Sequence, residues 1–103
     1  MPIHTIRFCR TPLSITDLPE TARVHAERDA ELLPLLGTRC WSFEELLAHC
    51  RSHADLGRAS WLAMALVNCM EFGLVRTEES AFLEETVHKF ERALDGTITF
   101  EDI

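Results

Sequence analysis

The chain has 103 residues, of which 47% are hydrophobic and 26% charged, a composition that suits one folded domain with a single core and is too short for two. Its formal net charge is -7 at pH 7, which disfavours a nucleic-acid partner because affinity for phosphate comes from Lys and Arg. No segment reaches the roughly 18 apolar residues of a membrane span, and no signal-peptide pattern opens the chain, so we expect a cytoplasmic protein.

The four cysteines are Cys9, Cys40, Cys50 and Cys69. They lie in otherwise ordinary segments and are not closely spaced in the sequence, as the cysteines of a disulfide-rich scaffold would be. This usage is typical of reduced thiols in a cytosolic protein. We therefore expect no structural disulfide.

The first predicted element is a strand over residues 3–9. Ile6 and Phe8 alternate with Thr5 and Arg7, so the two pairs should face opposite sides of a sheet. Residues 11–20 contain two prolines and predict irregular chain with at most one weak strand.

A helix is predicted next, over residues 21–36. Pro34 lies near its end, where it either breaks the helix or starts a final short turn. Gly37 should close the element.

The following helix has the best-marked start in the chain, in the stretch WSFEELL. Ser42 and Glu45 have the spacing of a capping box, and Trp41 can pack on Leu46 as a hydrophobic staple. The helix should therefore begin at residue 43, and the polar residues 51–55 should end it.

A third helix is predicted over residues 57–72. Gly73 follows its last turn, at a position that often needs a left-handed backbone. Leu74 and Val75 then indicate a short extended piece.

A fourth helix should follow, capped by Thr77 and ending at Gly96. Its apolar stripe consists of Leu83, Val87, Phe90 and Leu94. Beyond it, Ile98 and Phe100 alternate with polar residues, which predicts a C-terminal strand that pairs with the N-terminal one.

Residues 31–79 read ELLPLLGTRCWSFEELLAHCRSHADLGRASWLAMALVNCMEFGLVRTEE. This run resembles the winged helices of precursor-peptide recognition elements, which are related to the chaperone of pyrroloquinoline quinone biosynthesis. The resemblance implies a fold that is mainly α with a small β component (α+β), with a winged helix-turn-helix-like core and an added C-terminal helix. The expected domain is single and spans residues 1–103, with the core at about 21–76 and the added helix and strand at 77–103.

The resemblance also implies a function: a leader peptide adds as a strand beside residues 3–9 and lies against the third helix. Carried over by position, the expected peptide- or partner-binding residues are Ile3, Thr5, Ile6, Arg7, Phe8, Trp61, Met64, Ala65, Asn68 and Phe72. The chain departs from the family in having at most one weak strand after the first, so we expect its groove to be built differently.

The function expected on these grounds is that of a non-catalytic accessory protein. It would bind a ribosomally made precursor peptide and present it to a modifying enzyme. On resemblance alone, we expect that enzyme to be a multinuclear-iron enzyme, and any metal would then belong to the enzyme, so we expect no cofactor in this chain.

The third helix carries no Lys or Arg over residues 59–72, where a DNA-reading helix would present cations to phosphates and bases. Its core face should hold Ala59, Leu62, Ala63, Leu66, Cys69 and Met70. That leaves Trp61, Met64, Ala65 and Phe72 to be covered either by the fourth helix or by another polypeptide. A winged-helix transcription regulator and an adaptor or inhibitor of another protein stay open as alternatives.

His49, Cys50 and His53 have a spacing that can place two imidazoles on one helical face for a metal. No further ligand stands at a fixed offset and Cys50 falls on the core side, so we interpret the pair as solvated histidines near a helix end. The cysteines lie in no catalytic signature and the four glycines stand singly, so we predict no catalytic residues.

Acidic pairs such as Glu44-Glu45 and Glu84-Glu85 are interpreted as solvated helix faces. The alternative is a negative surface that steers a basic partner. A small basic patch is expected from Arg7, Arg10 and Arg23, and it would instead favour an acidic leader peptide.

Overall fold

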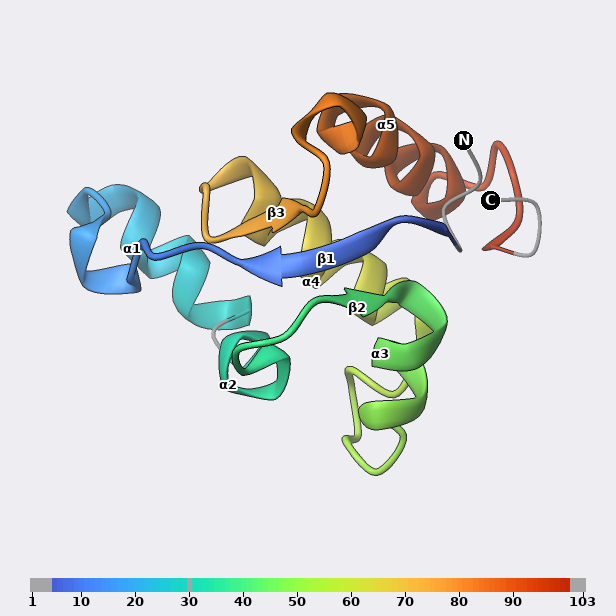
Figure 1. Ribbon diagram of the computed structural model, residues 1–103, viewed down its shortest axis with the longest axis horizontal. Coiled ribbons are helices and arrows are strands. Elements are labelled where there is room, and N and C mark those ends of the chain that lie inside the picture. Colours follow the sequence, from blue (N-terminus) through green and yellow to red (C-terminus); the bar gives the residue numbers. More distant parts are fainter. Residues whose placement is uncertain (1–4, 30, 101–103) are drawn as a thin grey trace.

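A short antiparallel sheet lies at the centre of the molecule in the computed structural model, which describes residues 5–29 and 31–100. Its strands are β1 (Arg7–Arg10), β2 (Trp41–Ser42) and β3 (Val75–Thr77), in the order β2-β1-β3. Figure 1 shows β1 crossing the middle of the molecule with α4 behind it. The N-terminal strand is therefore the central strand of the sheet.

The described part of the chain forms five α-helices: α1 (Glu20–Ala26), α2 (Leu32–Leu36), α3 (Phe43–His49), α4 (Ala59–Glu71) and α5 (Leu83–Leu94). The same described residues form three short 3-10 helices: η2 (Ile15–Asp17) after β1, η3 (Glu27–Asp29) between α1 and α2, and η4 (Ser80–Phe82) before α5. The prediction of a mainly helical α+β fold is confirmed.

The two faces of the sheet differ in environment. Successive side chains of a strand point to opposite faces, and residues directly opposite on neighbouring strands share a face. Phe8 is paired with Thr77, and both are fully buried. Cys9 is paired with Arg76 on the other face, where Arg7 and Arg76 are exposed. One face thus belongs to the core and the other lies toward solvent.

Helix α4 is the main helix of the core, and α5 packs along it. The predicted core face of α4 is confirmed for five residues, all buried: Leu62, Ala63, Leu66, Cys69 and Met70. Gly73 follows the helix with φ 77°, a left-handed conformation that glycine adopts without strain, as predicted.

The predicted start of α3 is confirmed in detail. The Ser42 side chain accepts from the Glu45 backbone N–H at 3.2 Å, and the Glu45 carboxylate accepts from the Ser42 backbone N–H at 2.9 Å. The backbone N–H groups of Ser42 and Glu45, which would otherwise lack an acceptor, are thus both hydrogen-bonded, each to the side chain of the other residue.

The predicted helix over residues 21–36 is interrupted. Helix α1 runs into η3, and α2 then forms a separate short helix that contains Pro34 in its first turn. A proline is tolerated there because the first backbone N–H groups of a helix have no partner within it. Of the two predicted outcomes, Pro34 thus belongs to a final short turn.

Two predictions for the C-terminal region are wrong. Thr77 does not cap the last helix: it lies buried in β3, its hydroxyl donates to the Glu79 carbonyl at 2.6 Å, and α5 begins only after η4. Residues 97–100 form no strand either, because the Thr97 backbone N–H donates to the Arg92 carbonyl at 2.9 Å and turns the chain back onto α5. Both sides of β1 are already occupied by β2 and β3.

Candidate functional site

The N-terminal strand offers no free edge for a peptide. On one side Arg7 and Phe8 pair with Ser42 and Trp41 of β2, and on the other side β1 pairs along its length with β3. The prediction that a leader peptide adds beside this strand is therefore wrong for Arg7 and Phe8, which are bonded or paired on both sides. Ile3, which was predicted to contribute, lies outside the described residues.

The two outer edges of the sheet are no better suited to strand addition. Val75 and Thr77 of β3 are 1% and 0% exposed, backbone included, so an added strand would have to displace the protein's own atoms. Strand β2 has only two residues, and the Ser42 N–H is already bonded in the capping box. Within residues 5–29 and 31–100, no strand edge of the sheet is thus open for main-chain pairing with a partner.

Several predicted binding residues belong to the core. Ile6, Phe8 and Ala65 are buried, with exposures of 3%, 0% and 2%, so little of each side chain is open to a partner. Ala65 lies beside Asp29, Glu31 and Leu56, so the segments before α2 and α4 cover it. Helix α5 packs along α4 on the side of Met64, where Leu94 is its neighbour, so the chain's own last helix supplies part of the cover considered for the second face.

The remaining predicted residues have different environments. Thr5 and Arg7 are exposed beside the sheet, whereas Met64, Asn68 and Phe72 are half-buried on α4. The amide of Asn68 donates to the Asp29 carboxylate at 3.0 Å. Trp61 is 42% exposed, which makes it one of the few large apolar side chains of the described region that face solvent.

Trp61 stands between two hollows. On one side, a hollow of about 210 Å³ is lined by Ser60, Trp61, Met64 and Leu94, and is almost entirely apolar. On the other side, a hollow of about 100 Å³ is lined by Trp61, Leu56 and Ala65, together with a polar set: Asp29, Glu31, His53 and Asp55. We call these residues together the Trp61 surface.

His53 organises the polar hollow. Its Nδ1 accepts from the backbone N–H groups of Asp55 and Leu56, at 3.3 and 3.1 Å. The ring proton is therefore on Nε2, which donates to the Glu31 carboxylate at 2.7 Å. The three carboxylates of Asp29, Glu31 and Asp55 lie around this ring and make the lining of the hollow acidic.

The three residues considered for a metal have separate partners. The His49 ring stacks on Trp41 with 4.5 Å between centroids, Cys50 is buried, and His53 bonds to Glu31. Burial raises the pKa of the Cys50 thiol. His49 is exposed at the end of α3 and His53 is half-buried, which agrees with the interpretation of the pair as histidines near a helix end, although each also has a side-chain partner.

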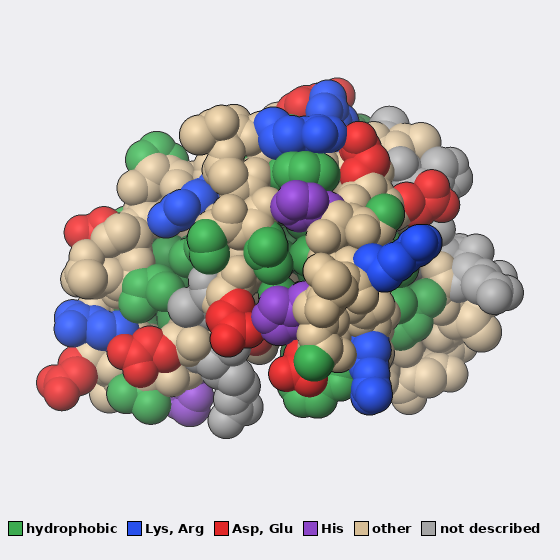
Figure 2. All heavy atoms as spheres, turned by 90° about the horizontal axis from the view of Figure 1, so that it is seen from below, with side chains coloured by type: hydrophobic (Ala, Val, Ile, Leu, Met, Phe, Trp, Pro, Cys, Tyr) green, Lys and Arg blue, Asp and Glu red, His purple; other side chains and the backbone are tan. Residues whose placement is uncertain are grey.

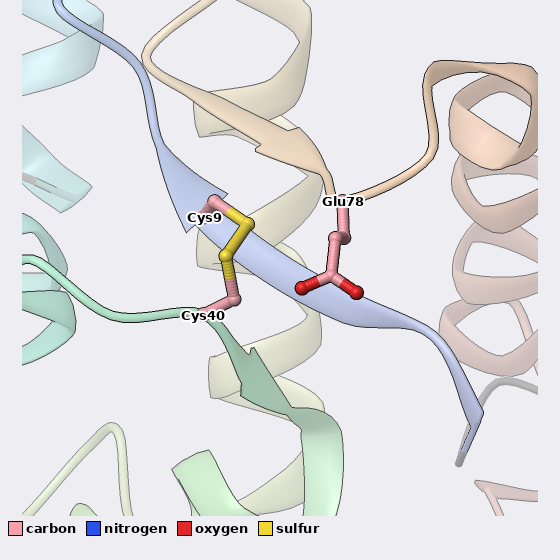
Figure 3. Close-up of side chains that lie close together, drawn as sticks. All are labelled: Cys9, Cys40 and Glu78. Atoms are coloured by element: carbon pink, nitrogen blue, oxygen red, sulfur yellow. A yellow bond between two sulfur atoms is a disulfide. The ribbon is translucent and has the colours of Figure 1, made fainter.

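A disulfide joins Cys9 to Cys40, which contradicts the prediction of reduced thiols (Figure 3). The pairing of Phe8 with Trp41 places Cys9 opposite Cys40 on neighbouring antiparallel strands, with 4.4 Å between their Cα atoms. Sequence reasoning missed this pair because it did not predict β2. Cys50 and Cys69 remain free and buried, and burial, followed by the charge of Asp29, raises the pKa of Cys69 to about 12.

The charge distribution gives no support to a nucleic-acid interface. Figure 2 shows Lys and Arg side chains scattered among acidic and hydrophobic ones on the face it presents, with no continuous basic area. Several cations are also paired: Arg39 with Glu45 at 2.9 Å, Lys89 with Glu85 at 3.2 Å and Arg7 with Glu78 at 3.6 Å.

No known protein family matches this chain, and no curated protein or solved structure matches it either. In the part of the chain that the structure describes, none of the helices combines the length and the apolar character needed to cross a bilayer.

Proposed function

We propose that the protein is a non-catalytic accessory protein that binds a segment of another polypeptide at the Trp61 surface. The observation that carries this proposal is the exposed indole of Trp61 between an apolar and an acidic hollow. Tryptophan is enriched among the residues that dominate binding energy at protein interfaces.

The sizes of the two hollows favour side chains as occupants. Volumes of about 210 and 100 Å³ lie below the range of roughly 300 to 1,000 Å³ that small-molecule pockets have. The larger hollow suits an apolar side chain. The smaller one suits a Lys or Arg side chain, whose cation can contact the carboxylates of Glu31 and Asp55 and the face of Trp61.

The proposed partner class follows the resemblance of residues 31–79: a ribosomally made precursor peptide that is presented to a modifying enzyme. The mode of binding differs from the one that the resemblance implies. Because β1 is central and the outer edges are occupied, recognition here depends on side-chain pockets rather than on an added strand.

A display selection tests this proposal. Random linear peptides are selected on the immobilised protein, and the selected pool is then measured against Trp61→Ala and against Val24→Ala. Val24 is 66% exposed on α1 and is a matched control for the loss of an exposed apolar side chain. We expect the pool to combine an apolar residue with Lys or Arg, and to bind Trp61→Ala about 30-fold more weakly than wild type. Val24→Ala should bind like wild type.

The proposal is overturned by a pool that binds Trp61→Ala as tightly as wild type, or by the absence of any enriched pool. Enrichment of acidic peptides would also contradict it, because the smaller hollow is negative. Calorimetry with a precursor peptide encoded beside this chain, in wild type and Trp61→Ala, then tests the partner class.

A further inference from the structure

Three potential metal ligands converge on the solvent-facing side of the sheet. The sulfur atoms of Cys9 and Cys40 and a carboxylate oxygen of Glu78 all lie within 4.8 Å of one another. Each comes from a different segment: Cys9 from β1, Cys40 from the residue before β2, and Glu78 from the residue after β3. Figure 3 shows the Glu78 carboxylate directed toward the two sulfur atoms, on the side of the sheet away from α4.

Two thiolates and a carboxylate form a donor set that Zn²⁺ binds well, and three protein ligands leave a fourth tetrahedral position open. We propose that the Cys9–Cys40 disulfide is reversible and that the reduced protein binds one zinc ion through Cys9, Cys40 and Glu78. This proposal rests on the sheet and is independent of the Trp61 surface.

The chemistry has two steps. A dithiol reductant supplies two electrons and two protons, which break the sulfur–sulfur bond and give two thiols, while the reductant becomes a disulfide. Zn²⁺ then replaces the two thiol protons and forms two zinc–sulfur bonds of about 2.3 Å. Oxidation and zinc binding therefore exclude each other, because both use the same two sulfur atoms.

The geometry allows the change without rearranging the sheet. Tetrahedral coordination requires the sulfur atoms to separate to about 3.8 Å. Cys9 is 4% exposed and fixed in β1, but Cys40 is half-buried and precedes β2, so its side chain can turn and a reductant can reach it. The Glu78 side chain is 51% exposed and has room to move onto the metal.

Arg7 balances the charge of the occupied site. Two thiolates, one carboxylate and Zn²⁺ sum to a single negative charge. The Arg7 guanidinium lies 3.6 Å from Glu78 and donates to the Cys40 carbonyl at 3.1 Å, so a positive charge is already held beside the ligands. The other two cysteines do not compete, because both are buried in the core.

Cobalt titration of the reduced protein tests the proposal. The full chain is reduced with a phosphine under anaerobic conditions and titrated with Co²⁺, whose thiolate charge-transfer absorption reports sulfur ligation, and Zn²⁺ is then added to displace it. We expect saturation at one metal ion per chain, and no signal from the oxidised protein. Cys40→Ser should lose the signal. Glu78→Gln should bind at least about tenfold more weakly, whereas the neighbouring Glu79→Gln should bind like wild type.

Absence of cobalt–thiolate absorption in the reduced wild type overturns the proposal. Equal affinity of Glu78→Gln and Glu79→Gln contradicts the role of Glu78. If reduction unfolds the chain, zinc must restore its far-UV circular dichroism, because metal binding is then coupled to folding. Failure to restore it also counts against the site.

Discussion

The ring centroids of Phe8 and Phe90 lie 5.8 Å apart, and both side chains are fully buried. Phe8 comes from the central strand and Phe90 from the last helix, so this contact fastens α5 to the sheet. Phe43 of α3 also packs on Phe90, with 5.2 Å between ring centroids. Phe90 therefore connects three elements that are distant in sequence.

Phe90→Ala should strongly destabilise the fold. Removing a buried phenylalanine costs about 3 to 5 kcal/mol, because apolar contacts are lost and a cavity remains. That is a large part of the roughly 5 to 15 kcal/mol by which a domain is stable. Urea unfolding monitored by circular dichroism measures the change. Val24→Ala is the control and should change the unfolding free energy by less than about 0.5 kcal/mol. A similar effect of both substitutions would show that Phe90 does not hold α5 in place.

Local signals in the sequence predicted the start of α3 and the end of α4. The capping box of Ser42 and Glu45 involves residues three apart, so its geometry follows once the helix forms. The alternation of Ile6 and Phe8 likewise predicted that these two side chains share one face of the strand, and both are buried. Such signals depend on neighbouring residues alone.

The arrangement of the sheet could not be predicted in this way. Strand β2 has two residues and no alternating pattern, and its pairing with β1 depends on how the intervening helices pack. Missing β2 led directly to two errors, the free edge assigned to the first strand and the absence of a disulfide. The stripe that includes Val87 and Phe90 predicted that α5 buries one face, and α4 was one of the two partners considered for it, but the pattern alone did not decide between them.

Ser42→Ala should destabilise the protein by about 1 kcal/mol, because the Glu45 backbone N–H loses the side-chain acceptor at the start of α3. The measurement is again the free energy of urea unfolding at neutral pH. Ser52→Ala replaces an exposed serine in the turn after α3 and should have little effect. Equal losses in the two variants would contradict the capping role.

The contribution of Glu45 should depend on pH. The backbone N–H of Ser42, then the Ser42 hydroxyl and Arg39, hold the pKa of Glu45 below its ordinary value of 4.5. A lowered pKa in the folded state means that the stabilisation is fully present above pH 4.5 and is lost as the pH falls through the folded-state pKa. The difference in unfolding free energy between wild type and Glu45→Gln should therefore be constant near neutrality and shrink in acid.

Urea unfolding from neutral pH down to about pH 3 checks this dependence. Glu44→Gln is the matched variant, since it removes a charge from the same helix turn but leaves the capping box intact. A difference for Glu45→Gln that grows as the pH falls would mean that the carboxylate is not stabilised in the folded state.

Reduction of the Cys9–Cys40 disulfide should destabilise the protein when metal is kept away. The bond spans 31 positions, and closing a loop of this size stabilises a fold by about 3 to 4 kcal/mol in the chain-entropy description. We expect a reductant, in the presence of a chelator, to lower the urea midpoint of the wild type and to leave that of a Cys9→Ser/Cys40→Ser double variant unchanged.

A count of reactive thiols tests directly whether the disulfide is formed. The native protein should show no reactive thiol, because Cys50 and Cys69 are buried and burial raises the pKa of each. Unfolding without a reductant should expose two thiols, whereas four would mean that the bond does not form.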